Sequence, residues 1–90
     1  MEEEHIYCLI AFDGAFGAVQ ARRTLEGAGL TAHIMPTPRE ISVSCGLSVR
    51  LPPEGYPQAR AALESCRGDC RFYRMAYGPG GRSLTPLPNA

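Results

Sequence analysis

The pattern of apolar and polar residues along the chain alternates between segments typical of strands and segments typical of helices. The points where the pattern changes predict where each helix or strand begins and ends. Four segments are rich in β-branched, aromatic and other apolar residues and are closed by Gly or Pro, a pattern typical of strands. Two segments between them place apolar residues three and four positions apart, which is typical of amphipathic helices. The predicted order is strand 5–12, helix 15–28, strand 31–35, strand 47–51, helix 56–66 and strand 70–77.

An internal repeat indicates how these elements are arranged. The pattern Gln-Ala-Arg-x-x-Leu-Glu occurs at residues 20–26 and again at 58–64, each time within a helix that lies between two strands. The chain then consists of two βαβ halves. This predicts an α+β, ferredoxin-like split βαβ fold: a four-stranded antiparallel sheet in the order 4-1-3-2 with both helices on one face. The repeated leucines, Leu25 and Leu63, are expected to enter one core.

The length of the chain allows a single domain. Chains of 90 residues rarely support two hydrophobic cores, so residues 1–77 are expected to form one ferredoxin-like domain. Residues 78–90 combine Gly and Pro without a periodic apolar face. We therefore expect them to form a flexible tail.

Charge and composition exclude several classes of function. Nine Arg balance nine Asp and Glu and no Lys occurs, which rules out a Schiff-base lysine and a P-loop lysine. The arginines are dispersed apart from a small group at 67–74, so nucleic acid is not an expected partner. The longest apolar run, 6–12, is too short to cross a bilayer. The acidic start Met-Glu-Glu-Glu is unlike a signal peptide, and we expect a cytoplasmic protein with reduced thiols.

The connection between the second and third strands is the least repetitive part of the chain and longer than a hairpin needs. Excess loop length in a compact domain usually serves function. Its cysteine, Cys45, precedes Gly46, which can leave backbone N–H groups available. A thiol reacts as the thiolate, which cations and hydrogen-bond donors favour; the loop offers Arg39, Ser42 and Ser44. Two interpretations are open here: Cys45 is a reactive thiol, or it is a small apolar plug under the loop.

The remaining cysteines and the two histidines do not predict a metal site. Cys66 and Cys70 lack the two-residue spacing of zinc knuckles and have no second pair. They are expected to be buried thiols, with a disulfide between them as the alternative. Cys8 lies in mid-strand and is expected in the core, and His5 and His33 fall on strands that the predicted order separates. Neither a metal nor a cofactor is expected.

Residues 37–47 read Thr-Pro-Arg-Glu-Ile-Ser-Val-Ser-Cys-Gly-Leu, and this run resembles the signature of the selenium/sulfur carrier-like family of small domains. The resemblance covers residues 5–77. It implies a functional loop cysteine at Cys45, preceded by an arginine and an acidic residue at Arg39 and Glu40. The other three cysteines and the tail fall outside the signature, and the Cys-Pro-x-Pro motif of the sulfur-relay proteins is absent.

The resemblance and the loop chemistry together predict a sulfur or selenium carrier rather than a true enzyme. Cys45 would accept the atom as a persulfide- or selenosulfide-type adduct, and Arg39 would stabilise the thiolate and the anionic adduct. Ser42, Ser44 and the amides around Gly46 would donate hydrogen bonds. A protein donor, expected to be a desulfurase-like enzyme, and a protein acceptor are implied. The alternatives are an adaptor for a larger selenium- or sulfur-handling enzyme, and a regulatory module that binds a small ligand as a homodimer.

Overall fold

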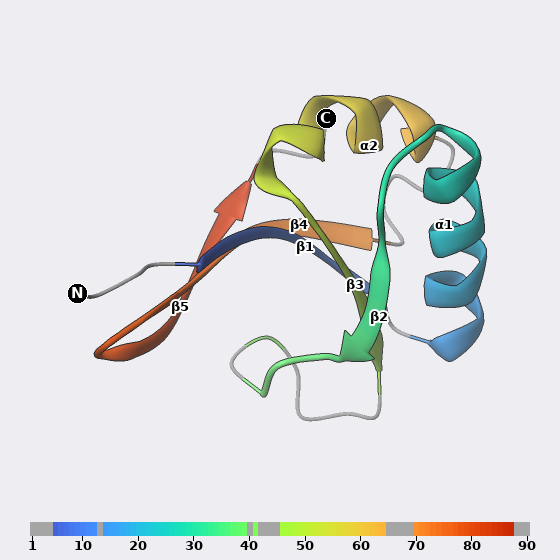
Figure 1. The fold of residues 1–90 in the computed structure, drawn as a ribbon. Coiled ribbons are helices and arrows are strands. Elements are labelled where there is room, and N and C mark those ends of the chain that lie inside the picture. The colour runs from blue at the N-terminus through green and yellow to red at the C-terminus, as the bar shows by residue number, and fades with distance from the viewer. Residues whose placement is uncertain (1–4, 13, 40, 42–45, 65–69, 88–90) are drawn as a thin grey trace.

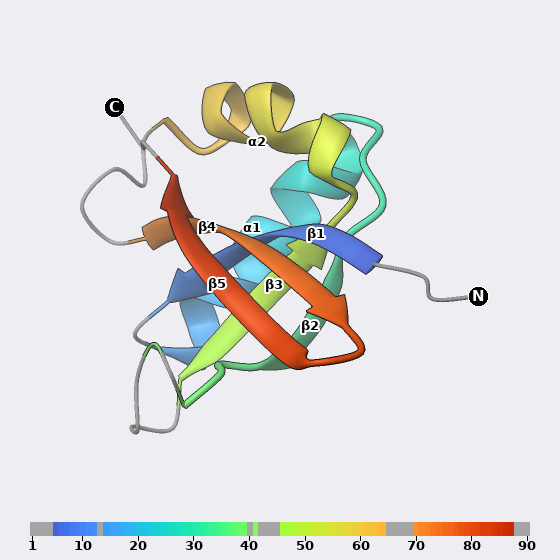
Figure 2. The ribbon, with the colours of Figure 1, turned by 90° about the vertical axis from the view of Figure 1, so that its left-hand side faces the viewer.

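The computed structural model describes residues 5–12, 14–39, 41, 46–64 and 70–87. Five strands form one sheet in the spatial order β2-β3-β1-β4-β5, and every neighbouring pair is antiparallel. The helices lie to the right of the sheet and above it in Figure 1, and behind and above it in Figure 2. In chain order the elements are β1 (His5–Phe12), α1 (Ala15–Gly27), β2 (His33–Pro36), β3 (Leu47–Leu51), the 3-10 turn η1 (Pro53–Gly55), α2 (Tyr56–Ala62), β4 (Cys70–Gly78) and β5 (Gly81–Leu87).

The prediction of four strands is wrong, because part of the expected flexible tail is a strand. β5 pairs with β4 from Gly78↔Gly81 to Phe72↔Leu87. Gly81, the first residue of β5 after the turn, has φ +116°, a conformation that favours glycine. Leu87 also packs against the core. The architecture is therefore α+β with two helices on a five-stranded antiparallel sheet, rather than the four-stranded sheet that was predicted.

Both helices contribute to one hydrophobic core. Leu25 of α1 is fully buried and Leu63, which caps α2, is 3% exposed; both belong to the same cluster. The two repeated leucines therefore enter one core, as predicted. Helix α2 ends at Ala62, four residues before the predicted end. The strands contribute the other side of this core through the side chains of Cys8, Ile10, Phe12, Val49, Leu51, Cys70 and Phe72.

Helix α1 ends at Gly27, one residue before the predicted end, in a motif that Gly29 makes possible. Gly29 has φ +88°. The Leu30 N–H donates to the carbonyl of Leu25 and the Gly29 N–H donates to that of Glu26, both at 3.0 Å, which are the two bonds of a Schellman motif. Ala28 follows Leu25 at the helical spacing of three, which predicts that it lies on the same buried stripe, but it is the exposed C-cap residue of α1.

The face of the sheet opposite the helices also contains buried residues. Leu9 and Met75 are fully buried, although they point away from the helix-facing residues that alternate with them on β1 and β4. Ser48 is 0% exposed as well, whereas the alternation of β3 predicted a buried face formed by the neighbouring Leu47, Val49 and Leu51. This second face is therefore well packed around β1 and β3, and it leads to the long connection between β2 and β3.

Candidate functional site

The loop with the predicted reactive thiol begins and ends at a closed base. Pro36, the last residue of β2, pairs with Leu47, the first residue of β3. One residue further out, the Thr37 N–H donates to the carbonyl of Gly46 at 3.2 Å. Main-chain contacts therefore hold the two ends of the loop together.

A hydrogen bond between two side chains, one in the loop and one on β3, also stabilises this base. The hydroxyl oxygens of Thr37 and Ser48 lie 2.7 Å apart, and either can be the donor. Ser48 is wholly buried, so the bond satisfies a hydroxyl that would otherwise be desolvated without a partner. This explains why a polar residue occupies a buried position on β3, and it ties the start of the loop to the sheet.

The described part of the loop makes one turn that exposes Arg39. The Ile41 N–H donates to the carbonyl of Pro38 at 3.0 Å. Pro38 is buried and Ile41 is half-buried, whereas Arg39 between them is exposed. No carboxylate pairs with Arg39 within the described residues, so within that part of the chain its positive charge is not neutralised. An exposed, unneutralised guanidinium can attract an anion or favour a nearby thiolate.

Two of the five predicted site residues fall within the described structure. Arg39 is exposed and Gly46 is buried, with its carbonyl in the hydrogen bond to Thr37. Cys45, Ser42 and Ser44 lie outside the described residues. The contact between the Arg39 guanidinium and the Cys45 sulfur therefore stays a prediction.

The two thiols that the structure describes are unsuited to surface chemistry. Cys8 and Cys70 are each 2% exposed, both in the helix-facing core. Burial raises the pKa of Cys8 from 9.0 to about 12, because desolvation disfavours the thiolate. The prediction that Cys8 packs in the core is confirmed. Cys70 is buried in this core, as predicted. Cys66 lies outside the described residues, so the alternative of a disulfide between Cys66 and Cys70 stays a prediction.

The described residues hold no cluster of three or more His, Cys, Asp or Glu side chains that could bind a metal ion. His5 and His33 lie on β1 and β2, and β3 separates these two strands. No helix in the described ranges is long and apolar enough to cross a membrane.

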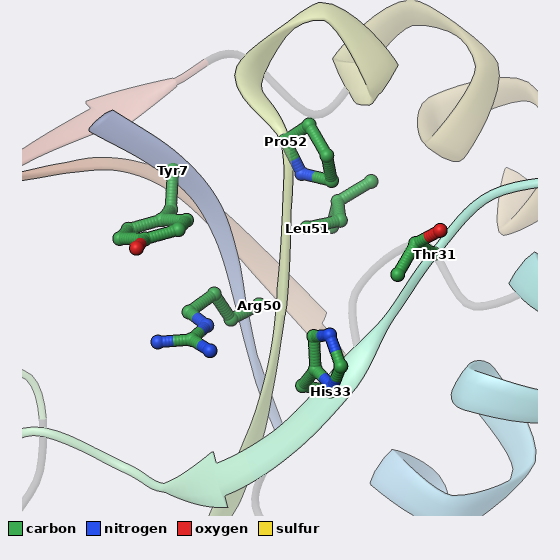
Figure 3. Close-up of a pocket in the computed structure, with 6 residues that line it drawn as sticks. All are labelled: Tyr7, Thr31, His33, Arg50, Leu51 and Pro52. Atoms are coloured by element: carbon green, nitrogen blue, oxygen red, sulfur yellow. The ribbon is translucent and has the colours of Figure 1, made fainter. Parts of the chain in front are cut away.

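A group of three residues that the sequence did not bring together lies on the helix-free face. The Arg50 guanidinium carbon of β3 is 4.6 Å from the centre of the Tyr7 ring of β1, and His33 of β2 is the register partner of Arg50. Figure 3 shows these three side chains around a pocket. The alternation of β3 could have indicated that Arg50 leaves the helix-facing core, but only the strand register brings it to Tyr7 and His33.

Comparisons with known proteins give one assignment. Neither the curated proteins nor the solved structures contain a match to this chain. A family profile does match, over residues 7–68 of the 90. These residues include most of β1, both helices and the whole loop from Thr37 to Gly46. The chain belongs to the family described as "Putative Se/S carrier protein-like".

Proposed function

We propose that this protein carries a sulfur or selenium atom on Cys45 between a protein donor and a protein acceptor. Arg39 favours the Cys45 thiolate and the anionic adduct, and Ser42, Ser44 and the main-chain amides near Gly46 donate hydrogen bonds to the transferred atom. The observation that carries the proposal is the family membership of residues 7–68, a match that includes the cysteine-containing loop.

The transfer needs no external oxidant or reductant. The Cys45 thiolate attacks the outer sulfur of a persulfide on the donor, the S–S bond of the donor breaks, and the donor thiolate leaves. Cys45 then holds a persulfide, which is an anion after loss of its proton. An acceptor thiolate attacks the same outer sulfur, and Cys45 returns to its thiolate form. Selenium is transferred in the same two steps. Cys45 then holds a selenosulfide in place of the persulfide, and no external oxidant or reductant is needed.

Two features of the described structure support this proposal. The loop base is fixed by the Thr37 contacts to Gly46 and Ser48, and Gly46 directly follows Cys45 in the sequence. The exposed Arg39 supplies a positive charge on the same loop. Cys8, by contrast, is buried in the core and its pKa is raised to about 12, which argues against the same role for that thiol.

Peptide-resolved labelling with iodoacetamide as a function of pH tests the reactivity on which the proposal depends. Cys45 is expected to label fastest at neutral pH, with a pKa below the value of about 8.5 for a free thiol. Replacing Arg39 with Ala is expected to raise that pKa and slow the labelling, because the cation favours the thiolate. Arg39→Lys retains the charge and most of the rate. Arg23→Ala removes an exposed arginine from α1 and is the matched control, with no expected change.

The labelling experiment also separates a carrier from an adaptor. An adaptor needs no reactive thiol, so Cys45 would label no faster than Cys8 and Cys70. Labelling of Cys45 at their rate, with no response to Arg39→Ala, contradicts the carrier proposal and favours the adaptor.

A further inference from the structure

A pocket opens on the helix-free side of the sheet, where β2 and β3 meet the start of β1. Its volume is about 140 Å³, which is room for several water molecules or for one small molecule. The lining residues are Tyr7, Thr31, His33, Arg50, Leu51 and Pro52. All six are described, and none of them belongs to the cysteine loop.

Arg50 is the main charged group of this pocket. Its guanidinium carbon lies 4.6 Å from the centre of the Tyr7 ring, within the range of a cation–π contact. A guanidinium over a ring uses its flat face, and its N–H donors point outward from the edge of the same plane. Within the described residues no carboxylate pairs with Arg50. Figure 3 shows the Arg50 guanidinium below the Tyr7 ring.

His33 adds a second donor beside Arg50. The two residues are register partners on β2 and β3, and residues directly opposite each other on one face of an antiparallel pair have Cβ atoms roughly 5 Å apart. His33 is exposed and Arg50 is half-buried, so both can reach a molecule that enters from solvent. Among the described residues, no acidic side chain lines the pocket, so this wall favours an anion.

The remaining walls are largely apolar. Leu51, Pro52 and the ring of Tyr7 line the pocket beside the two donors. An inorganic ion would gain nothing from these groups, whereas a small organic molecule can place its hydrocarbon part against them and its charged end at Arg50.

We propose that this pocket binds a small organic carboxylate. The two carboxylate oxygens accept a pair of parallel hydrogen bonds from the Arg50 edge, His33 donates a third through a ring N–H, and Pro52 and the Tyr7 ring contact the hydrocarbon part. Tyr7 holds the guanidinium in place before the ligand arrives, which lowers the entropy cost of binding. The site does not use Cys45, so it is independent of the proposed carrier function.

Amide chemical shifts of the ¹⁵N-labelled full chain test the proposal, with butyrate as the probe and butyramide as its uncharged isostere. Butyrate is expected to shift the amides of His33, Arg50 and their strand neighbours with a Kd of about 1 mM, since the ligand has few atoms. Butyramide is expected to shift none of them. Arg50→Gln is expected to weaken butyrate binding roughly tenfold or more. Arg23→Gln, which removes an exposed charge from α1, leaves the Kd unchanged.

Three outcomes overturn the proposal: no saturable shift with butyrate, equal binding of butyramide, or tighter binding of inorganic phosphate, which would identify a general anion site instead. Arg50→Lys and His33→Phe serve if Arg50→Gln does not fold. Each is expected to weaken butyrate binding several-fold, because each removes a hydrogen bond while leaving the rest of the pocket. Cys45→Ser is expected to bind butyrate like the wild type, so loss of the carrier function and loss of this site are distinguishable.

Discussion

Strand β5 is expected to stabilise the domain through two half-buried leucines, and deleting residues 79–90 tests this. Leu87 packs against the helix-facing core and is the register partner of Phe72. Leu84 lies opposite the fully buried Met75. The deletion removes both side chains and the main-chain partners of β4, and it turns β4 into an exposed edge strand.

The size of the effect follows from the burial of the leucines. Full burial of a leucine contributes about 1.5–3 kcal/mol, and each of these two is half-buried. Together they contribute roughly 1.5–3 kcal/mol. The main-chain hydrogen bonds between β4 and β5 also stabilise the folded state. This gain is largely cancelled by the conformational entropy that the β5 residues lose on folding, so it adds little to the total. For a domain of this length, the loss lowers the melting temperature by roughly 10–20 °C.

Thermal and urea denaturation followed by circular dichroism measures the loss. Leu87→Ala alone is expected to cost about 1–2 kcal/mol, whereas Ser83→Ala, at an exposed position of the same strand, is expected to stay within about 0.5 kcal/mol of the wild type. If the deletion leaves the melting temperature unchanged, or if Leu87→Ala is as neutral as Ser83→Ala, β5 does not contribute to the stability of the domain.

Three further predictions concern the core and the loop base. Leu25→Ala is expected to cost roughly 3–5 kcal/mol in urea denaturation because Leu25 is fully buried, whereas Val19→Ala, at a position of α1 that is 42% exposed, should be nearly neutral. Thr37→Val leaves the buried Ser48 hydroxyl without its partner and is expected to cost about 1–3 kcal/mol; adding Ser48→Ala should recover part of that cost, and strictly additive costs would contradict the bond. The pKa of Cys8 is raised on folding from 9.0 to about 12, so the unfolded chain loses this proton first and stability falls as the pH rises between those values. The difference in free energy of unfolding between the wild type and Cys8→Ala should therefore decrease above pH 9. A difference that does not change with pH would contradict the raised pKa of Cys8 in the folded protein.

The sequence predicted those elements of the fold whose period is unambiguous. β1 and β3 coincide with the predicted strands, since their apolar residues form unbroken or alternating runs. Strand β5 escaped prediction because its two leucines stand three positions apart and are accompanied by Gly and Pro, so neither period is met. β5 pairs with β4 through main-chain hydrogen bonds, and these do not require any particular side chains that could be recognised in the sequence.

A local motif is enough to identify candidate residues within one short loop, whereas residues that only the strand register brings together give no such signal. Arg39 and Cys45 stand out in a single short loop, and the exposure of Arg39 agrees with its expected role. Ser48 looked like a surface residue, because the hydroxyl that satisfies it belongs to Thr37 on the other side of the loop. Arg50, Tyr7 and His33 are far apart in sequence, and only the order β2-β3-β1 brings them together.

The carrier function is tested most directly by measuring the mass of the intact protein. The protein is first incubated with a desulfurase and either cysteine or selenocysteine as the substrate. A gain of one sulfur or selenium atom is expected, located on the peptide that contains Cys45 and removed by a thiol reductant. Cys45→Ser should abolish the gain, and Cys66→Ser should retain it. An unchanged mass of the wild type, or a gain that persists in Cys45→Ser, would contradict the account of Cys45 as the carrier thiol.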